Sequence, residues 1–259
     1  MAAVKQEKAS AASSTAVAAS PKAPSAPLYP IALHDDATAK LVANARPAVL
    51  GALLLLGFGP LVAAPETALQ YSLPLVAAVQ VAYAILCLPV AGSQHSKPGR
   101  KTRPGEKKKA DASGPSPVIA AILSILLTAI VTPAVHIMFI LFGAPCLDNV
   151  LNTLLCSAHF ALLGLFPVFY ARALDGEALM ALAGASAPLD ETFGGLAGAL
   201  LGAWLGAVPI PLDWDREWQK WPVTIVVGMY MGSCLFAKLF GSVPFLYGKR
   251  LGVSETKEE

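Results

Sequence analysis

Six long apolar segments, separated by shorter polar ones, dominate the chain from residue 48 onward. A helix of about 20 apolar residues crosses the hydrocarbon core of a bilayer, because each residue adds about 1.5 Å of rise. The pattern therefore predicts an all-α, polytopic membrane protein with six transmembrane helices. The predicted spans are residues 48–64, 73–91, 117–142, 150–171, 193–211 and 222–240, the last with an apolar extension to residue 247.

Polar segments flank these spans and divide the chain. Residues 1–45 are rich in Ala, Ser, Pro and Lys and lack the apolar core of a cleaved signal peptide, so we expect a disordered tail. Residues 46–247 form the predicted six-helix transmembrane domain, with a basic loop at 92–116, and residues 248–259 form a second tail. Residues 178–187 are apolar but too short to span, so we expect them to lie in the interface or to re-enter partway.

Composition excludes an ordinary soluble domain. Hydrophobic residues make up 55% of the chain and charged residues 14%, against roughly 45–50% and 25% in soluble proteins. The four cysteines form no Cys-x-x-Cys pair, and three of them lie inside apolar spans. A zinc site or a disulfide framework is therefore not expected, and the cysteines are interpreted as small buried hydrophobes.

The placement of the basic residues predicts the orientation in the membrane. With six spans, both termini lie on one side, and that side holds sixteen Lys or Arg residues. The opposite side holds two, Arg216 and Lys220. Because cytoplasmic loops carry the excess of Lys and Arg, we expect both termini to be cytoplasmic and the loop around Arg216 to be luminal.

Seven Lys or Arg residues cluster between Lys97 and Lys109 in the loop 92–116. Such a cluster can bind anionic lipid headgroups, but the favoured interpretation is a solvated loop that determines topology. No aromatic residue is interleaved with these basic residues, so binding of nucleic acid is not expected.

A dense polar-aromatic patch separates the fifth and sixth spans. Its residues are Asp213, Trp214, Asp215, Arg216, Trp218 and Trp221, and Pro209 and Pro211 precede it. Three Trp residues at a membrane border fit an aromatic belt, but the interleaved charges predict a fixed structure at the membrane surface. The favoured interpretation is a salt bridge among Asp213, Asp215 and Arg216 with indoles packed around it, serving structure or partner docking. Binding of a phosphate or glycan headgroup, or catalysis, are the alternatives.

The fifth span carries a stripe of four glycines. Gly194, Gly198, Gly202 and Gly206 recur every four residues and therefore lie along one helix face, with Trp204 in the same span. A glycine stripe lets a second helix approach closely. That second helix is either the sixth span, where Gly228 and Gly232 repeat the spacing, or a helix of a partner protein.

A second motif lies at the end of the third span. It consists of His136, the run Phe142-Gly143-Ala144-Pro145, and Thr153 shortly after it. An ionisable group inside a membrane is a functional hypothesis by default, but a neutral His136 hydrogen-bonded to a neighbouring helix is favoured over a base. His159 in the fourth span is a candidate neighbour. Because the two histidines have no third ligand nearby, no metal site is expected. By parity of the spans, both motifs face the same side of the membrane.

The two motifs together resemble those of the Pig-F family of glycosylphosphatidylinositol (GPI) anchor biosynthesis proteins. The resemblance covers about residues 118–238, and Glu217 departs from the proline expected at its position. It implies a multi-pass protein of the endoplasmic reticulum membrane that partners the catalytic subunits of GPI ethanolamine-phosphate transferases. Membrane lipid, GPI intermediates included, is the other expected contact.

The sequence favours a non-catalytic role in that complex. It has no Gly-x-Ser-x-Gly, no phosphate loop and no long luminal segment, so we expect no cofactor and no catalytic residue, and a subunit that stabilises the transferases. The alternative is a membrane-embedded enzyme or flippase that acts directly on a GPI lipid intermediate. Scarce buried charge and the lack of an internal repeat argue against a flippase.

Overall fold

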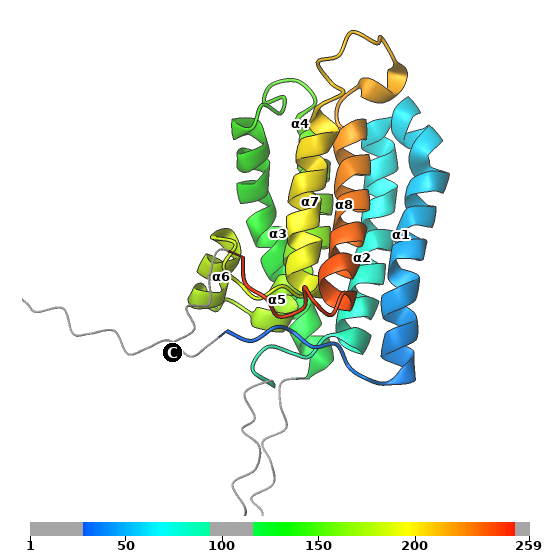
Figure 1. Ribbon diagram of the computed structural model, residues 1–259. Coiled ribbons are helices and arrows are strands. Elements are labelled where there is room, and N and C mark those ends of the chain that lie inside the picture. The colour runs from blue at the N-terminus through cyan, green and yellow to red at the C-terminus, as the bar shows by residue number, and fades with distance from the viewer. Residues whose placement is uncertain (1–27, 94–115, 252–259) are drawn as a thin grey trace, which may run out of the picture.

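The computed structural model describes residues 28–93 and 116–251, which form a bundle of helices (Figure 1). The long helices are α1 (Ala37–Ala63), α2 (Pro65–Cys87), α3 (Pro117–Leu141), α7 (Glu191–Ala207) and α8 (Val223–Ser242). A further continuous helical segment comprises α4 (Val150–Phe160), the π-helix η2 (Ala161–Leu165) and α5 (Phe166–Arg172). The short α6 (Gly176–Ala183) and the 3-10 turn η3 (Glu217–Gln219) lie at opposite ends of the bundle.

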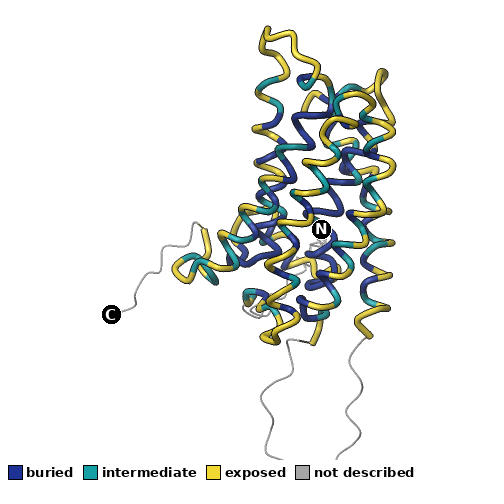
Figure 2. Tube along the Cα trace, turned by 90° about the vertical axis from the view of Figure 1, so that its right-hand side faces the viewer, coloured by how far each residue is buried: buried dark blue, intermediate teal, exposed yellow. Residues whose placement is uncertain are grey.

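Five helices of the described residues are long and apolar enough to cross a membrane: α1, α2, α3, the segment Val150–Arg172, and α8. The predicted multi-pass helical architecture is therefore confirmed. The predicted fifth span corresponds to α7, which is not among these five helices. It has only 17 residues, but it runs beside α8 (Figure 1). Exposed positions follow the outside of the bundle (Figure 2), where large apolar side chains such as those of Leu56, Ile122 and Leu235 can face lipid.

The first two helices begin earlier than the sequence indicated. The predicted tail boundary at residue 45 is wrong, because α1 begins at Ala37 and the Asp36 carboxylate accepts a hydrogen bond from Ala39 N at 3.1 Å. Arg46 precedes the predicted first span by two residues, but it lies inside α1 and is buried. A single residue, Ala64, joins α1 to α2, which starts at Pro65 rather than at residue 73.

The remaining boundaries lie close to the predicted ones, except at the end of the chain. Residues 244–248 form turns rather than an extension of α8. The start of the predicted second tail is held by a hydrogen bond from Leu189 N to Lys249 O at 2.8 Å. The predictions for residues 1–27, for most of the basic loop 92–116 and for residues 252–259 lie outside the described residues. The segment 178–187 begins within α6, whose first turn is capped by Asp175.

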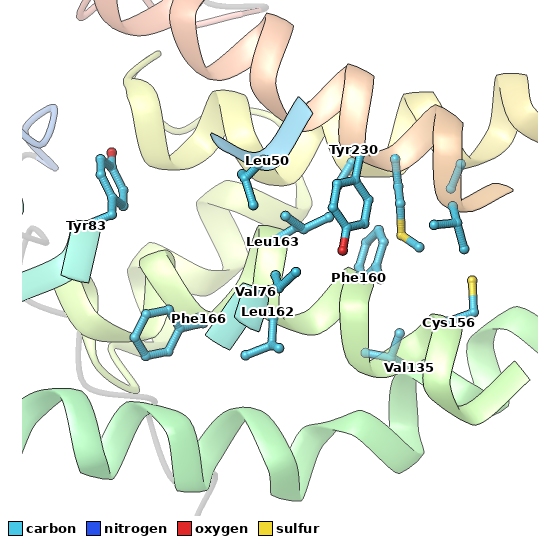
Figure 3. Close-up of a cluster of buried hydrophobic side chains, with 14 of the residues drawn as sticks. Leu50, Val76, Tyr83, Val135, Cys156, Phe160, Leu162, Leu163, Phe166 and Tyr230 are labelled. Carbon is cyan, nitrogen blue, oxygen red and sulfur yellow. The ribbon is translucent and has the colours of Figure 1, made fainter. Parts of the chain in front are cut away.

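The segment Val150–Arg172 is the centre of the core. Its side chains meet those of the surrounding helices: Leu50 of α1 and Val76 of α2 point toward Phe160 and Leu163 (Figure 3). Because the π-helix adds a residue to its turn, it leaves carbonyl groups without regular partners. The Gln80 amide of α2 fills this gap by donating to Leu162 O at 2.7 Å.

A buried charge cluster joins four helices at the level of Gln80. Gln80 Oε1 accepts from Arg46 Nε at 2.8 Å, and the Arg46 guanidinium lies 4.2 Å from the centre of the Tyr83 ring. Arg46 also lies 3.7 Å from Glu191 Oε1, and the two side chains are 4% and 3% exposed. Lys238 Nζ approaches the same Glu191 oxygen at 3.9 Å. The cluster therefore ties α1 and α2 to the α7–α8 pair.

Both described ends of the chain lie at the same end of the bundle, which we call the terminal end (Figure 1). There Asp190 caps α7 through Phe193 N at 2.9 Å, and it also accepts from Arg172 at 2.5 Å and from Ile31 N at 3.0 Å. The loop between α7 and α8 lies at the opposite end, which we call the loop end. This placement puts both sequence motifs at one end.

Candidate functional site at the loop end

The four-glycine stripe of α7 packs directly on the backbone of α8. A Cβ atom built on Gly198 would lie 2.1 Å from Gly232 O, and one on Gly202 would lie 2.0 Å from Gly228 O. Gly194 and Gly206 at the two ends of the stripe are equally close to Phe236 O and Thr224 O, at 2.3 Å each. No residue larger than glycine fits at these positions unless one of the two helices moves.

The stripe is therefore an internal packing face, and Gly228 and Gly232 are its mates as the sequence suggested. The hypothesis that this stripe receives a helix of a partner protein is wrong, because α8 already occupies it. Trp204 lies on the outer side of α7 and is 65% exposed. The glycine contact instead fixes where the loop between α7 and α8 begins and ends.

Gln219, which the sequence did not single out, organises that loop. Its side-chain nitrogen donates to Pro209 O at 2.7 Å and to Leu212 O at 2.8 Å, while its Oε1 accepts from Arg216 N at 2.8 Å. One buried side chain thus satisfies three backbone groups, which is what holds an irregular loop in a single shape. The sequence does not identify Gln219 as important, because its partners are backbone groups and only the folded loop shows which ones it contacts.

The charges of the patch point away from the bundle. Asp213, Asp215 and Arg216 are exposed, and among the described residues none of them forms an ion pair. The expected salt bridge among them is therefore wrong. The ion pair of this loop joins Lys220 Nζ to Glu217 Oε2 at 2.8 Å, and this hydrogen bond lowers the pKa of the Glu217 carboxyl.

Two indoles of the patch, those of Trp214 and Trp218, pack against each other in a tilted arrangement. The Trp214 and Trp218 ring centres lie 5.9 Å apart, a spacing typical of aromatic pairs. Trp214 is 54% exposed, whereas Trp218 is half-buried against the core. Asp215 adopts a left-handed backbone conformation with φ of 50°, which helps to turn the chain outward.

The two sequence motifs meet at Thr153. Trp221 Nε1 donates to Thr153 Oγ1 at 3.0 Å, and that hydroxyl lies 3.3 Å from Pro145 O and 3.2 Å from Asn149 O, either of which can accept its proton. Gly143 has a φ of +99°, the conformation that lets the chain leave α3 at this point. The prediction that the motifs converge on one face is confirmed.

The remaining members of the second motif divide between surface and core. Phe142 is exposed, whereas Ala144 is buried. His136 is half-buried in α3, and its buried Nδ1 has no hydrogen-bond partner among the described residues. Its expected neighbour, His159, instead contacts α2: His159 Nε2 lies 3.1 Å from Ser72 Oγ. The predicted hydrogen bond of His136 to a neighbouring helix is thus not formed.

Comparisons with known proteins agree with the two motifs. The model of the GPI biosynthesis protein family Pig-F matches residues 45–242, a longer stretch than the motifs alone cover. The chain is 52% identical to glycosylphosphatidylinositol anchor biosynthesis protein 11 of Neurospora crassa over 87% of this chain and 82% of that protein. It is 35% identical to the protein of the same name from Aspergillus fumigatus, over 97% and 94% respectively. No solved structure matches the chain.

Proposed function

Because the chain belongs to the GPI biosynthesis protein family Pig-F, and thus has a role in GPI-anchor biosynthesis, we propose that it is a non-catalytic subunit of the GPI ethanolamine-phosphate transferases. In this role it stabilises the catalytic subunits in the membrane of the endoplasmic reticulum. The alternative, direct catalysis on a GPI lipid intermediate, would need reacting groups that are held close together.

One observation carries the proposal: hydrogen bonds tie the loop to the bundle, while three of its exposed charges have no ion-pair partner among the described residues. Gln219 and Trp221 anchor it to the bundle, while Asp213, Asp215 and Arg216 project from it. Charged side chains that do not stabilise their own fold, held on a rigid support, are suited to electrostatic recognition of another protein. The exposed indole of Trp214 beside them is of the kind that anchors protein interfaces.

The same proposal includes six spans, with both termini in the cytoplasm and the loop end in the lumen. In it α7 is the remaining span, supported by its close packing along α8. A glycosylation acceptor placed between Leu212 and Lys220, on a spacer that clears the membrane, is expected to be modified. The same acceptor near Lys101 is expected to stay unmodified, and the reverse pattern would overturn this orientation.

Arg216→Ala tests the subunit role. Because Arg216 is exposed and has no ion-pair partner in the described residues, the substitution is expected to leave the unfolding temperature of the isolated protein unchanged. It should reduce the yield of transferase that co-purifies, and GPI intermediates without ethanolamine phosphate should accumulate. Asp148→Ala, an exposed acid at the same end outside the patch, is the matched control.

Two outcomes separate the subunit from an enzyme. Overproduction of the catalytic partner should partly restore GPI synthesis in the Arg216→Ala strain, because mass action compensates for a weaker complex. An Arg216→Ala protein that assembles fully yet supports no synthesis, with or without extra partner, would favour direct catalysis instead.

A further inference from the structure

An apolar groove opens between α1 and α2, with α8 behind it. Its volume is about 480 Å³, within the roughly 300–1,000 Å³ of pockets that bind small molecules. None of its sixteen lining residues, all in the described part of the chain, carries a formal charge, and four carry a hydroxyl group: Thr67, Tyr71, Ser72 and Tyr230. The groove therefore suits an uncharged, largely apolar occupant.

The sequence of α1 keeps this groove open. Gly57 lines it, and a Cβ atom built there would meet nothing within 4 Å. Pro60 lines it three residues later, and the single-residue connection at Ala64 holds the two helices as a hairpin. Inside a membrane a groove with a mainly apolar lining is filled more favourably by hydrocarbon than by water.

Ser72 and His159, two polar residues at the back of the groove, are paired with each other. His159 is fully buried, and its Nδ1 lies 2.8 Å from Leu155 O, which can only accept a proton. Nδ1 therefore carries the hydrogen, and Nε2 accepts from the Ser72 hydroxyl at 3.1 Å. Leu69 O, 3.2 Å from Ser72 Oγ, is a second acceptor for the same proton. The Ser72 hydroxyl is therefore already paired and does not have to be desolvated by a hydrocarbon chain in the groove.

The groove reaches the membrane surface at the loop end. Ser72 lies seven residues along α2 from Pro65, which places it about 10 Å below the helix turn. Ala63 lines both this groove and a second hollow of about 540 Å³, which is bordered by Glu217, Trp218 and Lys220. The Lys220 ammonium and Glu217 carboxylate there are 39% and 83% exposed, so both remain accessible beside the end of the groove.

We propose that this groove holds one acyl chain of a zwitterionic glycerophospholipid, with the headgroup beside the Glu217–Lys220 pair. The ammonium complements the lipid phosphate, and the carboxylate complements the cationic end of the headgroup. Trp218 supplies the amphipathic ring that sits at headgroup level. The inference does not depend on the proposed subunit role and needs only that the bundle spans a bilayer.

Photolabelling of the full-length protein tests the proposal. The protein is placed in phosphatidylcholine vesicles with a trace of phosphatidylcholine carrying a photoactivatable group in its acyl chain, and the adducts are located by peptide mass spectrometry. Labelling of groove residues such as Leu54 and Leu75 is expected to exceed labelling of the exposed α3 residues Ile122 and Ile130. Equal labelling of both sets would mean contact with bulk lipid and would overturn the proposal.

Two matched variants of α1 sharpen the test. Gly57→Leu places a side chain in the groove and is expected to lower groove labelling to the level of the exposed α3 residues, because the leucine occupies the space of the acyl chain. Gly51→Leu is the control, because Gly51 also has nothing within 4 Å but does not line the groove. Both should keep the unfolding temperature of the parent protein. Undiminished labelling in Gly57→Leu contradicts the proposal.

Competition identifies the headgroup and the kind of occupant. Unlabelled phosphatidylethanolamine is expected to compete with the probe, whereas the anionic phosphatidylglycerol is expected to compete at least about fivefold less well, the effect of losing one favourable polar contact. Equal competition would refute the zwitterionic assignment. Protection of the groove by a co-purified membrane protein would show that a partner helix, and not lipid, occupies it.

Discussion

Gly202→Ala is the most direct test of the packing that positions the loop end. The added methyl carbon would lie 2.0 Å from Gly228 O and 2.6 Å from the carbonyl carbon of the same residue. Both neighbours are backbone atoms inside α8, so no side chain can rotate away. The two helices must instead separate until this carbon reaches an ordinary contact of 3.4 Å or more, and the contacts on either side of it loosen as well.

The expected cost follows from two opposing effects. Alanine is a better helix former than glycine by about 1 kcal/mol, whereas overpacking a tight core costs about 1–3 kcal/mol and more when backbone must move. Here the second effect wins, because the contact is backbone to backbone. Gly195→Ala is the control on the same helix: its nearest atoms would be at 3.7 Å, so it should be neutral or stabilising.

The assay is thermal unfolding of the purified full-length variants in one detergent. Gly202→Ala is expected to lower the unfolding temperature by about 5 °C, since 1 kcal/mol shifts a chain of this size by about 2–4 °C. Gly195→Ala should stay within about 2 °C of the parent or rise. If both variants unfold at the same temperature, α7 and α8 are not in the close contact that the glycine stripe implies.

Three further predictions address the rest of the bundle. Trp221→Phe removes the indole donor to Thr153 and should destabilise the protein by about 1 kcal/mol, measured by the same unfolding assay. Arg46→Ala leaves Glu191 buried without its nearest cation and should cost about 3–5 kcal/mol, and a double replacement with Glu191→Ala should cost less than the two single ones added. The pKa of Glu217 is lowered by its ammonium partner, so the pair stabilises the loop above the ordinary carboxyl value of 4.5 and is lost as the pH falls below it. Tryptophan fluorescence of the loop should therefore change on acidification in the parent and stay constant in Glu217→Gln.

The helical bundle was predictable from the apolar pattern because each span reports its environment residue by residue. A long run without charge is stable as a helix in lipid regardless of its neighbours. The predicted helix boundaries were wrong where a charged residue is buried inside a helix. The predicted first span starts at residue 48, although α1 begins at Ala37 and includes Arg46. The residues that make a buried Arg46 tolerable, Gln80 and Glu191, are distant in the sequence.

The candidate site, too, was predictable only in part. The glycine spacing indicated close packing and even the correct mates, Gly228 and Gly232, because four-residue periodicity is a local property. The arrangement of the patch was not predictable: the acids and Arg216 were expected to pair with each other. Instead Gln219 holds the loop, and the charges project outward. Which charges pair depends on the three-dimensional conformation of the loop, and the order of residues within the loop does not determine that conformation.

The sequence by itself determined the membrane setting, the helices and the family, because all three depend on local composition and on short motifs. The tertiary structure alone decided what each polar group does. Thr153 unites the two motifs, Arg46 and Glu191 link α1 to α7, and Ser72 and His159 hydrogen-bond to each other behind a groove. In a low-dielectric interior an unpaired polar group is costly, so each such partner stabilises the fold. Those partners come from distant parts of the chain, so they exist only once the bundle has formed.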